Sequence, residues 1–107
     1  MAQSDGETVF EVDAPAGALT VKGDLGFGVE RRFEKACGDL LSSDRPDLFV
    51  DLSATRYISS SCLGMLFLLH DRAKNRGKSV RVRVHKSTAP ICELMGLGDF
   101  VELEVVG

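Results

Sequence analysis

The 107-residue chain has no tryptophan, one tyrosine, two histidines and three cysteines, so the side chains that most often perform chemistry are scarce. Cys37, Cys62 and Cys92 are too few and too scattered for a disulfide framework. There is no CxxC pair, and neither His70 nor His85 is near a cysteine in the sequence. We therefore expect reduced thiols, no metal site and no cofactor.

Basic residues are not in excess, because the formal net charge is -3 at pH 7. This charge disfavours a nucleic-acid partner held by phosphate contacts. Long apolar runs are also missing: the longest, Met65 to Leu69, is far below the roughly 20 residues of a membrane span. The first ten residues lack a basic segment followed by an apolar run. We expect no signal peptide, no direct membrane insertion and a cytoplasmic protein.

The composition that remains, 44% hydrophobic and 27% charged, is typical of a folded soluble domain. At this length one core suffices, so we predict a single domain over residues 1–107, with 1–6 frayed. The apolar spacing predicts the element order β-β-α-β-α-β-α-β. Strands are expected at 8–12, 18–22, 48–52, 80–84 and 101–105. Helices are expected at 29–42, from the serine run at 59–61 to about 75, and at 88–95.

The last two strands alternate apolar and charged residues. Arg81 and Arg83 face away from the valines of their strand, and Glu102 and Glu104 do the same in theirs. If the two strands are neighbours, these four residues pair across an exposed face. The helices then cover mainly the other face, which predicts an α/β fold with a mixed sheet and one helical layer.

Ser59, Ser60 and Ser61 precede the most apolar helix of the chain. Serines at a helix start commonly cap it, with a contribution of roughly 1 kcal/mol relative to alanine. A phosphate added there would meet free backbone N–H donors and the positive end of the helix dipole. The run is therefore either a set of caps or a modification site.

Helical spacing divides the apolar residues of this helix into two groups. One stripe forms the expected core face: Cys62, Met65, Leu66, Leu69 and Ala73. Off this stripe, Ser60, Leu63, Gly64 and Phe67 share another face at spacing i, i+3, i+4, i+7. Leu63 and Phe67 are either an exposed contact pair beside a modifiable hydroxyl, or they are covered by the neighbouring helix.

At these residues the chain resembles the STAS family, the domain of bacterial anti-sigma factor antagonists and of sulfate-transporter tails. The resemblance extends from about Thr8 to Val105 and is strongest in VDLSATRYISSSCLGMLFLLHDRAKNRGKSVRV. The family pattern Asp-Ser/Thr-Ser/Thr-Gly-Leu-Gly is Ser59-Ser60-Ser61-Cys62-Leu63-Gly64 here. The segment from Ile91 to Phe100 is similar to the family's last helix and turn.

The resemblance implies a phosphorylation switch. In the antagonist branch, the anti-sigma factor is a serine/threonine kinase that binds the unphosphorylated protein and phosphorylates it, and a PP2C-type phosphatase reverses the modification. By position the acceptor is Ser60, with Ser59 or Ser61 as alternatives if the alignment is shifted. The partner surface would include Leu63, Gly64 and Phe67.

Two family acids are missing. Where the family has an acid before the acceptor, this chain has Ser59. Where the family has an acid after the second strand, this chain has Gly26, and Asp24 is expected to take the place of that acid in partner binding. Asp51, at the end of the buried strand, is expected to support the serine loop. These departures favour an alternative, a STAS scaffold of a lipid-transport or signalling complex that is never phosphorylated.

A third possibility is a small enzyme that uses Cys62 or the serines. Neither histidine lies near the motif in sequence, so no base is supplied to it. We therefore expect a protein that is not an enzyme.

Overall fold

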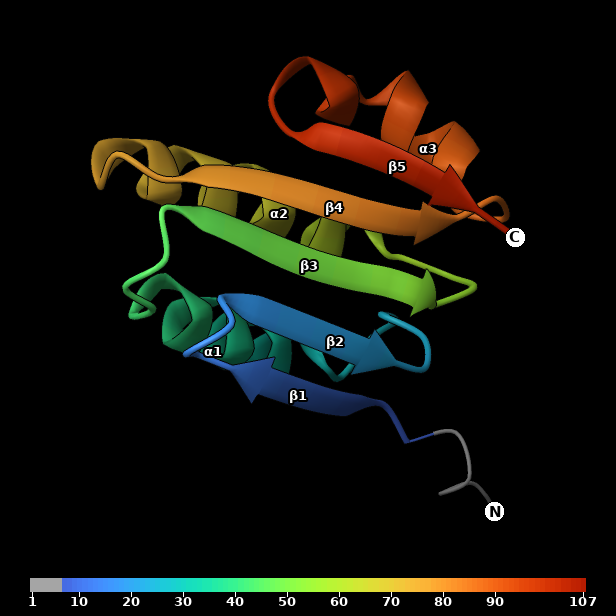
Figure 1. Ribbon diagram of the computed structural model, residues 1–107. Coiled ribbons are helices and arrows are strands. Elements are labelled where there is room, and N and C mark those ends of the chain that lie inside the picture. The colour runs from blue at the N-terminus through green and yellow to red at the C-terminus, as the bar shows by residue number, and fades with distance from the viewer. Residues whose placement is uncertain (1–6) are drawn as a thin grey trace.

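The computed structural model describes residues 7–107 and shows five strands, three α-helices and one short 3₁₀ helix (Figure 1). The elements follow the chain as β1 (Val9–Asp13), β2 (Ala18–Lys22), α1 (Glu30–Leu41), β3 (Asp47–Ala54), α2 (Ser60–Asn75), β4 (Ser79–His85), α3 (Ala89–Leu94), η2 (Leu97–Asp99) and β5 (Glu102–Val106). The predicted order is confirmed. The prediction that residues 1–6 are frayed lies outside the described residues.

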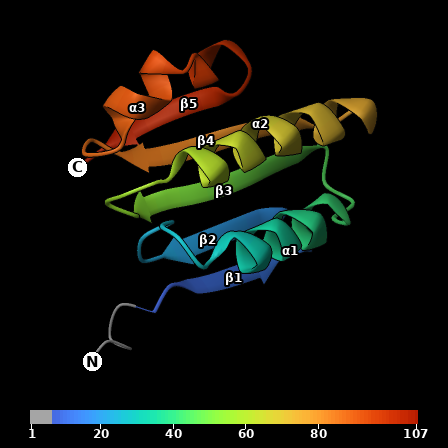
Figure 2. The same ribbon diagram turned by 180° about the vertical axis from the view of Figure 1, so that it is seen from behind.

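The strands form one sheet in the order β1-β2-β3-β4-β5, in which β1 is antiparallel to β2 and the other neighbours are parallel. Figure 2 shows α1 and α2 side by side on one face of the sheet, with α3 beside β5. This arrangement confirms the expected mixed sheet with one helical layer. Within residues 7–107, no helix combines the length and apolar character that crossing a membrane requires.

The core lies between the sheet and the helices. Its strand residues alternate with exposed ones, and the helices add one apolar face each. The side chains that are almost fully buried include Leu19, Val21, Phe33, Leu40, Leu48, Val50, Leu52, Leu66 and Val82. The strand predicted at 48–52 is longer, because β3 begins at Asp47 and ends at Ala54. It pairs on both sides with parallel strands, so its alternate residues Leu48, Val50 and Leu52 enter the core.

The opposite face of the sheet is charged, as predicted. In the β4–β5 register Arg81 lies opposite Glu102 and Arg83 opposite Glu104. The side chain of Glu104 accepts from both arginines, at 3.5 Å from Nη1 of Arg81 and 3.2 Å from Nε of Arg83. Both guanidinium groups also lie over the ring of Phe49, at 4.3 and 5.1 Å from its centroid. This face is held by ion pairs and cation–π contacts.

Helix α2 has a defined start and a defined end. Ser59 is its N-cap, in extended conformation. At the other end Gly77 adopts φ 71°, and the Lys78 N–H donates to the Ala73 carbonyl at 2.8 Å. Glycine is suited to this left-handed position, and the bond is that of a Schellman motif. The predicted end at Asn75–Gly77 is confirmed, and α2 places its first turn at the carboxyl ends of β3 and β4.

Candidate functional site

The three serines differ in exposure and in role. Ser59 is buried, 4% exposed, and its Oγ accepts from the backbone N–H of Cys62 at 3.2 Å. Its own N–H donates to the Leu25 carbonyl at 2.8 Å, so Ser59 also ties α2 to the loop after β2. Ser60 and Ser61 are exposed in the first turn. The capping hydroxyl and the exposed hydroxyls therefore belong to different residues.

The role of Ser59 gives a physical account of one departure from the family pattern. The pattern places an acid at this position, and aspartate is as good an N-cap as serine. Serine keeps the hydrogen bond to Cys62 and removes the negative charge next to Ser60. The helix start is thus preserved, while the electrostatic surroundings of Ser60 differ from those in the family pattern.

A groove of about 470 Å³ opens beside Ser60. We call it the Ser60 groove. It lies between the loop from β3 to α2 and helix α3, and it is lined by Arg56, Tyr57, Ile58, Ser60, Leu63, Ser87, Thr88, Ile91 and Met95. Tyr57 is 50% exposed and Met95 53% exposed. Apolar side chains exposed together in a concave surface are typical of a protein contact site.

The expectation of an exposed pair formed by Leu63 and Phe67 is wrong. Leu63 is 1% exposed and belongs to the hydrophobic core, although it also lines the groove. Phe67 is half-buried and packs edge-on against Phe100 of the segment before β5, with ring centroids 5.5 Å apart. Helix α2 lies between α1 and α3, so its covered surface is wider than one stripe.

Gly64 is exposed on α2, one turn after Ser60. A Cβ at this position would meet no atom within 4 Å. The fold of the described residues therefore does not require glycine here, and φ is not positive. An intrahelical glycine costs roughly 1 kcal/mol relative to alanine. Close approach of another molecule to the helix backbone would explain its presence.

The two acidic residues expected near the serines take different positions. Asp24 is exposed in the loop after β2, and its Oδ1 accepts from the backbone N–H of Arg56 at 3.2 Å. It therefore braces the loop that precedes the serines. Asp51 was expected to support this loop, and that expectation is wrong. Its carboxylate lies on the charged sheet face, 3.0 Å from the Ser53 nitrogen and 3.7 Å from Nη1 of Arg83.

Gly26, which stands where the family has an acid, is half-buried under Tyr57. A Cβ there would lie 3.7 Å from the Tyr57 ring, which is an ordinary contact distance. A Cβ would thus fit at this position without a clash. The backbone therefore does not require glycine at this position, and the absence of the family's acid is a property of the sequence alone.

The three cysteines are free and buried. Burial, and to a lesser extent the neighbouring Cys62, raise the pKa of Cys37 to about 12. Burial also raises the pKa of Cys62, although the hydrogen bond with the Ser59 side chain opposes this shift. The pKa of Cys92 is raised by burial and by Glu93. A thiol with a raised pKa is a poor nucleophile at neutral pH, so these cysteines act as core side chains.

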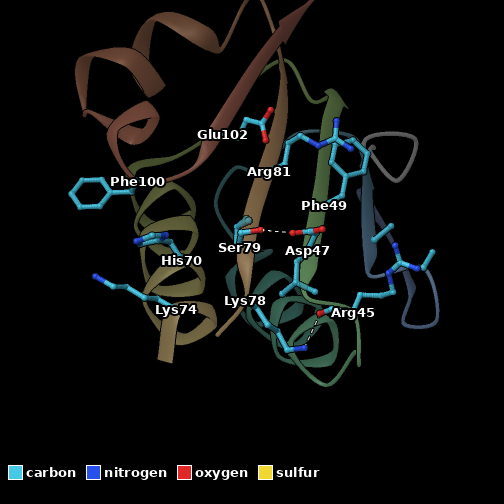
Figure 3. A pocket seen from close by; sticks show the side chains of 14 residues that line it. Arg45, Asp47, Phe49, His70, Lys74, Lys78, Ser79, Arg81, Phe100 and Glu102 are labelled. Atoms are coloured by element: carbon cyan, nitrogen blue, oxygen red, sulfur yellow. Dashed lines mark hydrogen bonds between the residues drawn. The ribbon is translucent and has the colours of Figure 1, made fainter. Parts of the chain in front are cut away.

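A second and larger cavity, of about 800 Å³, lies at the opposite ends of the strands (Figure 3). Figure 3 shows its central polar groups bonded to one another. Oγ of Ser79 donates to Asp47 at 2.7 Å, and Nζ of Lys78 donates to the Arg45 carbonyl at 2.7 Å. These bonds join the start of β3 to the start of β4. None of the predicted site residues lines this cavity.

Comparison with known proteins identifies the family. Residues 9–104 match the family model described as "Mlab, STAS domain". This match covers most of the chain, and the protein therefore belongs to the STAS domain family. A search of curated proteins finds no match.

Solved structures share the fold. An anti-sigma factor antagonist from Mycobacterium paratuberculosis is 22% identical, with a TM-score of 0.81 over 92% of this chain and 86% of that chain. The anti-sigma factor antagonist SpoIIAA in its unphosphorylated form is 10% identical, with a TM-score of 0.72 over 94% of this chain and 89% of that chain. At these identities the likeness establishes the fold.

The sequence did not single out the groove. Tyr57 lies in the loop before α2, and Ile91 and Met95 belong to α3 and its C-cap; only the fold brings these two stretches to Ser60. One signal was present: two large apolar residues, Leu94 at the end of α3 and Met95 at its C-cap, directly precede Gly96. Leu94 is 79% exposed. Apolar residues at a helix end with no core to enter are candidates for a contact surface.

Proposed function

We propose that the protein is an anti-sigma factor antagonist, switched off by phosphorylation of Ser60. In its unphosphorylated form it binds a cognate anti-sigma factor that is also a serine/threonine kinase. The observation that carries this proposal is the exposed hydroxyl of Ser60 at the mouth of the apolar Ser60 groove. The shared fold with anti-sigma factor antagonists supports it.

The mechanism follows from the charge of phosphate. A phosphoserine adds about −1.5 to −2 charge at pH 7. Placed beside Tyr57 and Met95, this charge would have to be desolvated when a partner covers the groove. Docking of an apolar partner surface is then unfavourable, and no change of fold is needed. A PP2C-type phosphatase would restore binding. In this proposal the protein acts in the bacterial cytoplasm, regulates transcription through its partner and has no enzymatic activity.

The proposal is tested by measuring partner affinity for three variants. Ser60→Asp adds one charge at the groove and should weaken binding by at least about tenfold, since a buried unpaired charge costs more than 1.4 kcal/mol. Ser60→Ala should bind as tightly as the wild type. Ser61→Asp, one residue away but outside the groove lining, is the matched control and should bind normally.

A scaffold that is never phosphorylated is the second candidate, and two observations favour it. The family model that matches carries the description "Mlab, STAS domain". In addition, Ser59 and Gly26 remove two acids from the surroundings of Ser60. Such a protein would be a constitutive subunit of a lipid-transport or signalling complex. In that case Ser60→Asp and Ser60→Ala would both leave partner binding intact.

A further inference from the structure

We propose that Arg56 is the counter-ion of a phosphate on Ser60 and binds it across the mouth of the Ser60 groove. This inference rests on the proposed phosphorylation of Ser60 and names the side chain that would bind the phosphate. It concerns a residue that the sequence analysis did not single out.

Arg56 is anchored at its backbone. It lies in the loop between β3 and α2, where its N–H donates to Oδ1 of Asp24 at 3.2 Å. Its carbonyl accepts from the hydroxyl of Ser87, on the other wall of the groove, at 3.4 Å. The Cα of Arg56 is thus fixed by contacts to two other loops. The side chain extends from this fixed point beside the groove.

Arg56 is also the only charged residue among the nine that line the Ser60 groove. The side chain of Arg56 is exposed, and within residues 7–107 it forms no ion pair with an acidic side chain. Desolvation lowers the pKa of His85, and the positive charges of Arg56 and Lys86 lower it further. Arg56 therefore brings a cation, unpaired within residues 7–107, to the same groove that Ser60 lines.

A phosphate on Ser60 would find few other partners. The backbone N–H groups of Ser60 and Ser61 lie in the first turn of α2, where no intrahelical acceptor exists. They can donate only from the helix side of the phosphate. The guanidinium of Arg56 can donate two parallel hydrogen bonds from the groove side, a geometry that matches phosphate oxygens. The resulting ion pair would cover apolar surface at Tyr57 that a partner needs.

The test uses protein with phosphoserine incorporated at position 60 during translation, so that no kinase is required. The second ionisation of the phosphate is followed by ³¹P NMR as a function of pH in the wild type, Arg56→Gln and Arg56→Lys. A nearby cation favours the dianion, so the phosphate pKa in the wild type should be lower than in Arg56→Gln by about half a unit. Arg56→Lys should retain part of this shift.

The matched control is Lys86→Gln, which removes an equal charge from the neighbouring loop but not from the groove lining. It should leave the phosphate pKa close to that of the wild type. An equal pKa in the wild type and Arg56→Gln, or an equal effect of both substitutions, would overturn the inference. The result is separable from the proposed function: failure of a kinase to modify Ser60 would refute the function, while this titration reports only on Arg56.

Discussion

Oγ of Ser59 lies 3.2 Å from the backbone nitrogen of Cys62, and this hydrogen bond assigns different tasks to adjacent serines. Ser59 is used by the fold as the cap of α2, and it is buried. Ser60, the next residue, is exposed beside the groove. A modification at Ser60 therefore need not disrupt the start of the helix, which is a requirement for a reversible switch.

This division predicts different stabilities for substitutions in the serine run. Ser59→Ala should lower the free energy of unfolding by about 1 kcal/mol, because it removes the cap. Ser59→Asp should lower it much less, since aspartate caps equally well. Chemical denaturation measures both values. Ser61→Ala is the control and should change stability by less than about 0.5 kcal/mol; an equal loss in Ser61→Ala would show that Ser59 has no special role.

Gly64 offers a test in which stability and binding should move in opposite directions. Gly64→Ala adds a Cβ into open space on α2. The variant should be more stable than the wild type by about 0.5–1 kcal/mol, because alanine is the better helix former. If a partner backbone approaches the helix at this point, the same substitution should weaken partner binding. Thermal unfolding measures the stability of the variant, and a binding titration of the same sample measures its affinity for the partner. Unchanged affinity would show that Gly64 is not part of the contact surface.

The Ser60 groove predicts which apolar residues matter for the partner. Met95→Glu and Ile91→Glu place a charge in the groove lining and should each weaken partner binding by about tenfold or more. Both side chains are exposed, so the fold should be retained. Val9→Glu is the matched control, because Val9 is 48% exposed on β1 and does not line the groove. Equal effects of all three variants would indicate a non-specific loss.

The raised pKa of Cys37 predicts a dependence of stability on pH. The thiol has an ordinary pKa of 9.0 when unfolded and about 12 in the folded protein. Between these values the unfolded state has lost a proton that the folded state keeps, so stability falls as pH rises above 9. The contribution is about 1.4 kcal/mol per pH unit within the window.

Comparison with Cys37→Ala isolates this contribution. Unfolding free energies of both proteins are measured from pH 7 to pH 11. The wild type should lose stability more steeply above pH 9 than the variant, which lacks the thiol. Parallel curves would contradict the raised pKa.

The sequence predicted the fold well because its signals were local. Alternation in Val80–Val84 defines a strand with one exposed face, and the glycine after Arg76 defines the end of α2. The covered width of α2 could not be predicted, because it depends on which distant segments pack on the helix, as Phe100 does at Phe67. The position of Asp51 was misjudged because strand alternation was not applied to it: Val50 and Leu52 enter the core, so Asp51 points to the charged face.

The most direct test of the proposed switch is intact-mass spectrometry after incubation with a cognate anti-sigma factor kinase and ATP, followed by peptide mapping. The account predicts one added phosphate, located on Ser60, and none on the Ser60→Ala variant. A kinase that binds the protein tightly yet leaves Ser60 unmodified, or that modifies Ser61 instead, would contradict it.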